Sequence, residues 1–347
     1  KQPNKISLLD LLARFTVPKR LKQDAANKDV GISIHIVIAH TESHKRWADR
    51  LQVQVPSQVG LVFANAGVEV KTLQLPPEHE AKEAINALIN YEDSITHYGS
   101  ADTPSYSFIV TPGWWETETV CFMQRENLLR SMTHLFCVPG SPAQVFGLST
   151  RKSRNSGFLG VYNHPASSES YVRNIRAIKG EVKRVCLAYN DNLASPYLQS
   201  SVRCQVTALE IDFERAGIKL VKHPWSLTSM NADLLREKMA SCDVLVTLNE
   251  PTAELFYRES TKLCISMNKP YVPSELDSVA AGAVLGVGVF GGSYATPLAS
   301  LIIKHILSPG TRMRTEVIGI PEQSGAHLNP QACESQGVEL TEEQETF

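Results

Sequence analysis

The strongest constraint on the fold of this chain is a repeated alternation of short apolar segments with longer amphipathic ones. The apolar segments are rich in Ile, Val and Phe, which is typical of β-strands. In the first part of the 347-residue sequence they cover residues 30–39, 68–75, 105–113 and 134–140, and the segments between them predict helices over 45–67, 80–95 and 125–132. This alternation predicts an α/β fold with mostly parallel sheets and right-handed crossovers.

The predicted helices differ in how well the sequence defines them. We expect Pro56 to kink or divide the first helix, because proline has no N–H to donate, and Gly67 to end it. In the second helix, Ala84, Leu88 and Ile95 recur near helical spacing, which indicates one amphipathic face.

The alternation starts again near residue 155, which predicts a second lobe. Strands are expected over 157–163, 184–190, 218–225 and 242–249, with a last extended segment over 314–320. Helices are expected over 167–178, 231–241, 252–261 and 297–307, and a long helix is expected to follow the loop 191–196 and to end at Gly217. The predicted divisions are an N-terminal extension (1–30), lobe 1 (31–155), lobe 2 (156–272), a return to lobe 1 (273–320), and a C-terminal segment with an acidic tail (321–347).

The composition is that of a globular protein without an unusual charge. Hydrophobic residues make up 43%, charged residues 20%, and the formal net charge is -2. No nucleic-acid partner is predicted, since such a partner requires a basic face. No apolar run reaches the ~18–20 residues that cross a bilayer, and the first residues are too polar for a secretory signal peptide.

The cysteines predict neither a zinc site nor a disulfide framework. The seven are Cys121, Cys137, Cys186, Cys204, Cys242, Cys264 and Cys333, with no CxxC spacing. Cys137, Cys186 and Cys264 stand in apolar stretches and are predicted to be small core residues. An odd number of free thiols fits a reducing compartment, which leaves a cytoplasmic location open.

Sequence motifs for cofactors are missing, and no cofactor, metal or catalytic residue is predicted. The chain has neither the dinucleotide fingerprint GxGxxG at a helix start nor the phosphate loop GxxxxGK[ST], the nucleophile elbow GxSxG or the zinc motif HExxH. The glycine-rich segment 286–292 is interpreted as a close-packed strand and turn. His40 and His44 are four apart but lack a third ligand, so a surface or helix-start role is favoured.

Polar and aromatic residues recur where the predicted strands end. In parallel sheets ligands bind at the carboxyl ends of strands, so these residues are the candidate ligand contacts. Two tryptophans follow the third strand and are interpreted either as exposed stacking platforms or as core residues. The predicted ligand-binding residues are Thr41, Glu42, Thr111, Trp114, Trp115, Ser141, Tyr189, Asn190, Asn249, Glu250, Ser274 and Glu275.

From about residue 139 onward the chain resembles the ABC-transporter substrate-binding family that includes tryptophan- and tyrosine-binding proteins. The similar segments are 139–163, RVCLAYNDNLASP, CDVLVTLNEPTAE, 269–307 and HLNPQACESQGVEL, in which an Asn-containing turn leads into a short helix. The first strand tip, HTESH, and the tip TPGWW differ from those usual in the family.

The resemblance implies a type I periplasmic-binding-protein fold. It implies two Rossmann-like lobes joined by a multi-strand hinge, which closes on a small ligand without covalent chemistry. The ligand classes open to it are amino acids, nucleosides and sugars. It also implies a periplasmic or otherwise extracytoplasmic location and an ABC permease as partner.

Two other functions stay open at this stage. One is a cofactor-independent isomerase or racemase that uses two thiols as acid and base, for which Cys137 with Cys186 or Cys242 are the candidate pairs. The other is a ligand-sensing module of a signalling system.

Overall fold

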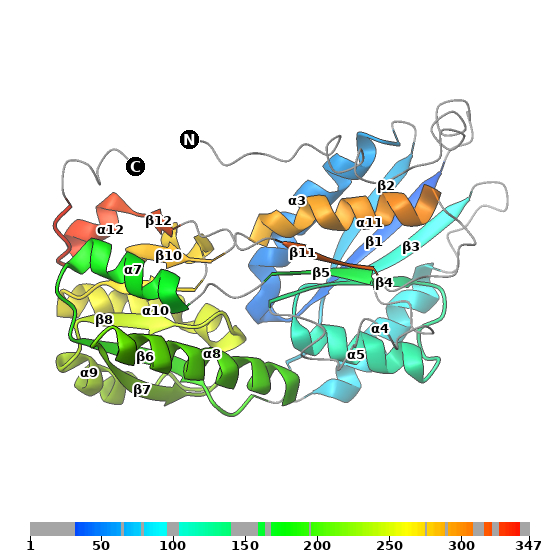
Figure 1. Cartoon of the computed structure of the whole chain (residues 1–347). Coiled ribbons are helices and arrows are strands. Elements are labelled where there is room, and N and C mark those ends of the chain that lie inside the picture. Colours follow the sequence, from blue (N-terminus) through cyan, green and yellow to red (C-terminus); the bar gives the residue numbers. More distant parts are fainter. Residues whose placement is uncertain are drawn as a thin grey trace. The chain divides into compact units, whose positions relative to one another are not determined.

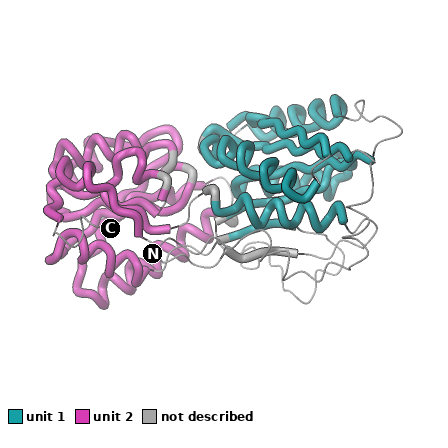
Figure 2. The backbone as a smooth tube through the Cα atoms, turned by 90° about the horizontal axis from the view of Figure 1, so that it is seen from above, with its two compact units in different colours: residues 1–138, 149–162, 291–319 teal, residues 139–148, 163–290, 320–347 magenta. Residues whose placement is uncertain are grey.

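The computed structural model describes residues 32–63, 66–77, 80–95, 104–139, 159–163, 168–193, 196–274, 276–288, 291–307, 316–320 and 326–340. The chain divides into two compact units, each built from separate stretches (Figure 2). Unit 1 comprises Lys1–Val138, Ser149–Tyr162 and Gly291–Gly319, and unit 2 comprises Pro139–Leu148, Asn163–Phe290 and Ile320–Phe347. Residues 273–290, expected in the return to lobe 1, are grouped with unit 2.

Unit 1 contains a six-stranded sheet with helices on both faces (Figure 1). Its strand order is β11-β5-β4-β3-β1-β2, and β1 pairs in parallel with both β2 and β3. The strands are β1 (Ser33–His40), β2 (Gly67–Gln74), β3 (Ser105–Thr111), β4 (Thr133–Pro139), β5 (Leu159–Asn163) and β11 (Glu316–Ile320). The strand over 157–163, expected to open lobe 2, is β5 in this sheet.

The helices of unit 1 pack in two pairs, α3 with α11 and α4 with α5 (Figure 1). They are α3 (Lys45–Gly60), α4 (Ala81–Ile95), α5 (Trp114–Arg125) and α11 (Ala295–Leu307), with short 3-10 helices η1 (Glu42–His44) and η3 (Gly291–Tyr294). The core lies between sheet and helices, where Val37, Ile109 and Leu88 are buried. Burial on both faces explains why β1 reads as a continuous apolar run.

Unit 2 has a four-stranded parallel sheet of order β7-β6-β8-β9 and a separate antiparallel pair, β10 with β12. These strands are β6 (Arg184–Asn190), β7 (Lys219–Trp225), β8 (Val244–Thr247), β9 (Tyr271–Pro273), β10 (Leu285–Val287) and β12 (Ala326–Leu328). The helices are α7 (Ser168–Lys179), α8 (Pro196–Arg215), α9 (Ala232–Ala240), α10 (Pro251–Met267), α12 (Pro330–Ser335) and the 3-10 helix η2 (Leu276–Val279). The expected Asn-containing turn does lead into the short helix α12, and the Asn329 side chain caps that helix by accepting from the Ala332 N–H.

The sequence-based helix boundaries in unit 1 were partly wrong. Helix α3 continues through Pro56 undivided and ends at Gly60, and Gly67 instead begins β2. The helix expected over 125–132 is displaced, because α5 occupies Trp114–Arg125 and residues 126–132 form turns.

Candidate ligand-binding edges of the two sheets

The two sheets share one topology around their central strands. In unit 1 the first strand, β1, lies between β2 and β3; in unit 2 the first strand, β6, lies between β7 and β8. The chain therefore winds outward in both directions from β1 and from β6. In open parallel sheets, ligands bind outside the carboxyl ends of the strands at this switch point. The candidate sites are the residues after β1 and β3 in unit 1 and after β6 and β8 in unit 2.

At the unit 1 switch point, a buried carboxylate ties the tip of β1 to the start of α5. Glu116 is fully buried, and its Oε1 accepts hydrogen bonds from the Thr41 backbone N–H at 2.8 Å and hydroxyl at 2.7 Å. The same oxygen lies 2.9 Å from Nδ1 of His44. Burial alone raises the pKa of Glu116, but His44 and Thr41 outweigh burial and hold that pKa below its usual value.

Gly113 allows this cluster to close. A Cβ on Gly113 would overlap the His44 ring and the Glu116 carboxylate, so no larger residue fits at this position. The second oxygen of Glu116, Oε2, is buried without a hydrogen-bond partner and faces the glycine. The TPGWW tip is thus shaped by its contact with His44 and Glu116.

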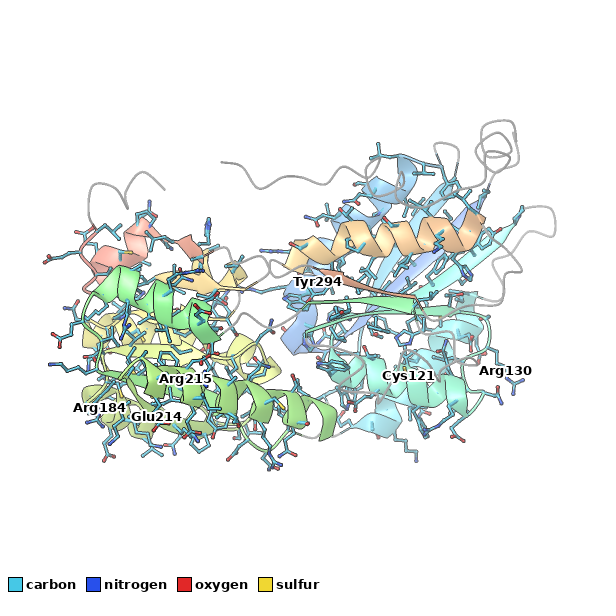
Figure 3. All side chains as sticks on the ribbon, viewed as in Figure 1. Cys121, Arg130, Arg184, Glu214, Arg215 and Tyr294 are labelled. Carbon is cyan, nitrogen blue, oxygen red and sulfur yellow. The ribbon has the colours of Figure 1, made fainter. Side chains whose placement is uncertain are left out.

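His44 also borders an aromatic group in unit 1. Its ring lies 6.0 Å from that of Trp47, and the Trp47 ring lies 5.2 Å from that of Tyr294, which Figure 3 labels. His40 and His44 are both buried, so the predicted surface role is wrong, whereas His44 does stand at the start of α3.

A chain of hydrogen bonds continues from Gly113 into the interior of unit 1. The Thr117 hydroxyl donates to the Gly113 carbonyl. The Thr111 hydroxyl lies 2.8 Å from both the Thr117 hydroxyl and Nε2 of His134. Nδ1 of His134 is 3.7 Å from the sulfur of Cys121, labelled in Figure 3. Thr111 is fully buried within this series of hydrogen bonds, so its hydroxyl already has internal partners.

Burial keeps the two titratable side chains in this series of hydrogen bonds, His134 and Cys121, uncharged. Burial lowers the pKa of His134 to about 3 and raises the pKa of Cys121 to about 12. A protonated thiol beside a neutral imidazole is a poor nucleophile, which disfavours a catalytic dyad of Cys121 and His134.

The two tryptophans that follow β3 are buried in the first turn of α5. Trp114 is 1% and Trp115 7% exposed, and Trp115 packs with Val37 and Leu88 in the core. Of the two interpretations, stacking platform or core, the structure favours the core. Glu42, in contrast, is exposed, and its carboxylate accepts from Nε2 of Gln74 at 3.1 Å.

At the unit 2 switch point, a second buried carboxyl, that of Glu250, follows β8 and reaches Trp225 at the end of β7. Oε1 of Glu250 accepts from the indole N–H of Trp225 at 2.8 Å, and Oε2 accepts from the Thr252 N–H at 2.8 Å, which caps α10. Burial raises the pKa of Glu250 to about 7, although Trp225 and Thr252 oppose the shift.

The tip of β6 is bound to the start of α10. Nδ2 of Asn190 donates to the Thr252 hydroxyl at 2.8 Å, and Oδ1 of Asn190 accepts from the Asn192 N–H at 2.9 Å. The structure therefore brings the predicted residues Asn190 and Glu250 together through Thr252. Their polar atoms are used within unit 2.

The remaining predicted residues differ in exposure. Tyr189 and Asn249 are partly exposed beside this edge, and Ser274 is buried immediately after β9. Ser141 and Glu275 lie outside the described residues. Glu116, Trp225 and Thr252 were missed. A glutamate within the first turn of a helix was the signal available for Glu116, since carboxylates favour that position.

Metal and thiol chemistry find little support. No three His, Cys, Asp or Glu side chains within the described ranges are grouped as metal ligands. Cys137 is buried in unit 1, and Cys186 and Cys242 are buried in unit 2. The Cys186 thiol lowers the pKa of Cys242, but Cys242 precedes β8 and so lies at the amino end of the sheet.

Comparisons with known proteins show the fold of the chain. No family model matches the sequence, and no curated protein matches it. The ABC domain from Streptococcus pneumonia in complex with L-Trp aligns with a TM-score of 0.66 at 13% identity, covering 91% of this chain and 98% of that one. A substrate binding protein with adhesive properties from Clostridium difficile aligns with a TM-score of 0.59 at 12% identity, covering 89% and 96%.

A repressor has the same architecture. The periplasmic binding ribose operon repressor protein from Lactobacillus acidophilus aligns with a TM-score of 0.50 at 12% identity, covering 83% of this chain and 94% of that one. The predicted fold class is confirmed: the chain is an α/β protein with the fold of type I periplasmic-binding-like proteins. Among the described residues, no helix is long and apolar enough to span a membrane.

Proposed function

We propose that this chain is a solute-binding protein that binds a small polar or aromatic molecule reversibly at the carboxyl edges of its sheets. The observation that carries the proposal is the switch point in each sheet, after β1 and β3 in unit 1 and after β6 and β8 in unit 2, because open parallel sheets bind ligands there. The fold shared with an L-Trp complex supports an amino acid as the first probe, and nucleosides and sugars remain in the panel.

The proposal involves no covalent chemistry. The thiols of the isomerase hypothesis are buried, and burial raises the pKa of Cys137, which disfavours an acid–base role. Capture by closure of a hinge and delivery to an ABC permease, which the family resemblance implies, stay predictions. Ligand-induced compaction in small-angle scattering would test the first of them.

A second candidate function is ligand sensing. The similarity in fold to a repressor favours it, because the same architecture serves regulation there. Both functions require a small ligand, so ligand binding is the property to test first.

The test is a thermal-shift screen of the purified chain against L-tryptophan, L-tyrosine, adenosine, uridine, D-ribose and D-glucose. A ligand at ~100 times its Kd adds about 2.7 kcal/mol of stability, which is easily measured. A saturable shift with one chemical class supports the proposal. The absence of any shift across the panel, repeated by calorimetry at millimolar ligand, would contradict it.

A further inference from the structure

Two hydroxyl groups of unit 2 differ from the switch-point residues Asn190 and Glu250, whose polar atoms already have hydrogen-bond partners. Tyr171 lies in the first turn of α7, and Ser274 directly follows β9. Helix α7 leads into the amino end of β6, so its first turn lies toward the carboxyl edge of the sheet, where β9 also ends. Both residues are thus at the edge where a ligand is expected.

The two side chains are buried and lack hydrogen-bond partners. Tyr171 is 2% and Ser274 6% exposed, and neither hydroxyl makes a hydrogen bond of acceptable distance and geometry. They are near each other, because a weak hydrogen-bonding interaction with the Ser274 hydroxyl lowers the pKa of Tyr171 against a larger increase caused by burial. The contact falls short of a hydrogen bond in distance or angle, so each hydroxyl still lacks a full partner. One turn along α7, the amide nitrogen of Asn174 is also buried and unpaired.

Buried polar groups without hydrogen-bond partners are unusual in a folded protein. Most buried polar groups are paired, and each unpaired one is costly, so such groups need an explanation. The other polar groups of the edge offer a contrast: both oxygens of Glu250 and both polar atoms of Asn190 already have partners within unit 2. The unused hydrogen-bonding capacity of this edge lies with Tyr171 and Ser274.

We propose that the Tyr171 and Ser274 hydroxyls are ligand contacts of unit 2 and donate hydrogen bonds to one acceptor oxygen of the solute, a carboxylate or carbonyl oxygen. The inference rests on the proposed function and adds the chemistry of the recognised group. Burial keeps the Tyr171 hydroxyl protonated, so it acts as a donor. Hydrogen bonds from hydroxyls to a carboxylate are charge-assisted and stronger than those to a neutral oxygen.

The proposal predicts an opposition between stability and binding. Tyr171→Phe and Ser274→Ala each remove an unpaired buried hydroxyl, so the ligand-free variants should keep or raise the melting temperature. Each should weaken binding of the solute by about tenfold, the effect of one lost hydrogen bond. Tyr91→Phe, which removes the hydroxyl of a partly buried tyrosine on α4 in unit 1, should leave binding unchanged.

The experiment measures melting temperatures without ligand, and then titrates the compound that shifts the unmodified protein in the panel above. For L-tryptophan, the acid is compared with L-tryptophanamide and tryptamine. Tryptamine, which lacks the acceptor, should bind at least tenfold more weakly than the acid, and the amide in between. For a nucleoside hit, the comparison is between analogues with and without a base carbonyl.

The outcomes separate the two proposals. If the protein binds a panel compound but both variants bind it as tightly as the unmodified chain, the hydroxyl pair is overturned and the proposed function stands. Variants that lose melting temperature without ligand would also overturn the pair, since the hydroxyls would then be structural. If the unmodified chain binds nothing in the panel, the proposed function fails, and the ligand role of the pair fails with it.

Discussion

Unit 1 and unit 2 each hold a buried glutamate at the switch point of the sheet, and the two carboxyls differ in pKa. Glu116 accepts from Thr41 after β1 and lies beside His44, a side chain that can carry positive charge, and its pKa is lowered. Glu250 accepts from the neutral indole of Trp225 and from Thr252, and its pKa is raised to about 7. The pKa values of the two glutamates thus shift in opposite directions, and His44 beside Glu116 is the main difference between their surroundings.

The difference also concerns what the polar groups are used for. In unit 1, hydrogen bonds continue from Gly113 through Thr117 and Thr111 to His134, so the switch point is connected to the interior. In unit 2 the corresponding bonds are local, and the two hydroxyls of Tyr171 and Ser274 remain unpaired nearby. In unit 1 the unpaired Oε2 of Glu116 faces Gly113. We infer that unit 1 uses its polar residues mainly for structure, and that unit 2 retains groups for a ligand.

The largest expected effect is an opposite dependence of the two units on pH. The pKa of Glu250 is raised from 4.5 to about 7, so its contribution to stability is complete below 4.5 and is lost as pH rises to about 7. At ~1.4 kcal/mol per unit, the loss is about 3 kcal/mol. The contribution of Glu116 has the opposite sign: it is present above pH 4.5 and is lost as pH falls through the lowered pKa.

Native-state hydrogen exchange measures both trends, with β6 and β8 reporting on unit 2 and β1 and β3 on unit 1. Glu250→Gln should flatten the dependence of unit 2 between pH 4.5 and 7 and leave that of unit 1 intact. An unchanged slope in this variant would show that another group causes the trend.

The next effect concerns the packing of unit 1 against Gly113. Gly113→Ala places a Cβ onto the His44 ring and the Glu116 carboxylate and should destabilise unit 1 by about 2.5 kcal/mol. Gly60→Ala, at a helical position with open space around it, is the matched control and should be neutral or slightly stabilising. Urea unfolding gives both values, and equal stability of the two variants would contradict the close packing.

Two isosteric threonine substitutions compare the hydrogen bonds of the units. Thr111→Val removes the partner of Nε2 of His134 and one of the two partners of the Thr117 hydroxyl, and should cost about 2 kcal/mol. Thr252→Val removes the partner of Nδ2 of Asn190 and should cost about 1 kcal/mol. Chemical denaturation measures both. A larger loss of unfolding free energy for Thr252→Val would contradict the inference that unit 1 is the unit whose polar residues mainly stabilise the fold.

The smallest expected effect comes from removing the hydrogen bond that the indole N–H of Trp225 donates to Glu250. Trp225→Phe removes the first of the hydrogen bonds that oppose the effect of burial on Glu250, so the pKa of that carboxyl should rise by about one unit. The upper end of the pH dependence of unit 2 should move upward accordingly. A pKa that falls would mean that solvent enters the space left by the indole.

Much of the fold could be predicted from sequence because the strands are buried and continuous. The segments that became β1, β3, β4, β6 and β8 stand out as apolar runs, and β2 and β7 as shorter stretches that mix apolar and polar residues. Their alternation with helices indicated the parallel topology. Helix α5 could not be found this way, since the sequence WWETETVCFMQR has no clear apolar stripe. Its burial comes from Trp114 and Trp115 and from the paired carboxylate of Glu116.

The candidate site was predictable in part because its residues follow strands that the sequence predicts. Asn190, Glu250 and Ser274 follow strands, so their position at the carboxyl edge of unit 2 could be expected. Glu116 lies inside a helix, and Tyr171 lies on a helix that precedes its strand, so a search of strand ends misses both. Partners such as Trp225 for Glu250 depend on the spatial order of strands, which the sequence does not specify.

The most direct test of ligand binding at the carboxyl edges is hydrogen exchange with and without a saturating panel compound. The account predicts slower exchange at residues 191–193, 248–253 and 276–279, which follow β6, β8 and β9. It predicts no change at residues 180–184 and 216–219, at the opposite ends of the strands. Protection confined to these opposite ends, or spread evenly over the chain, would contradict it.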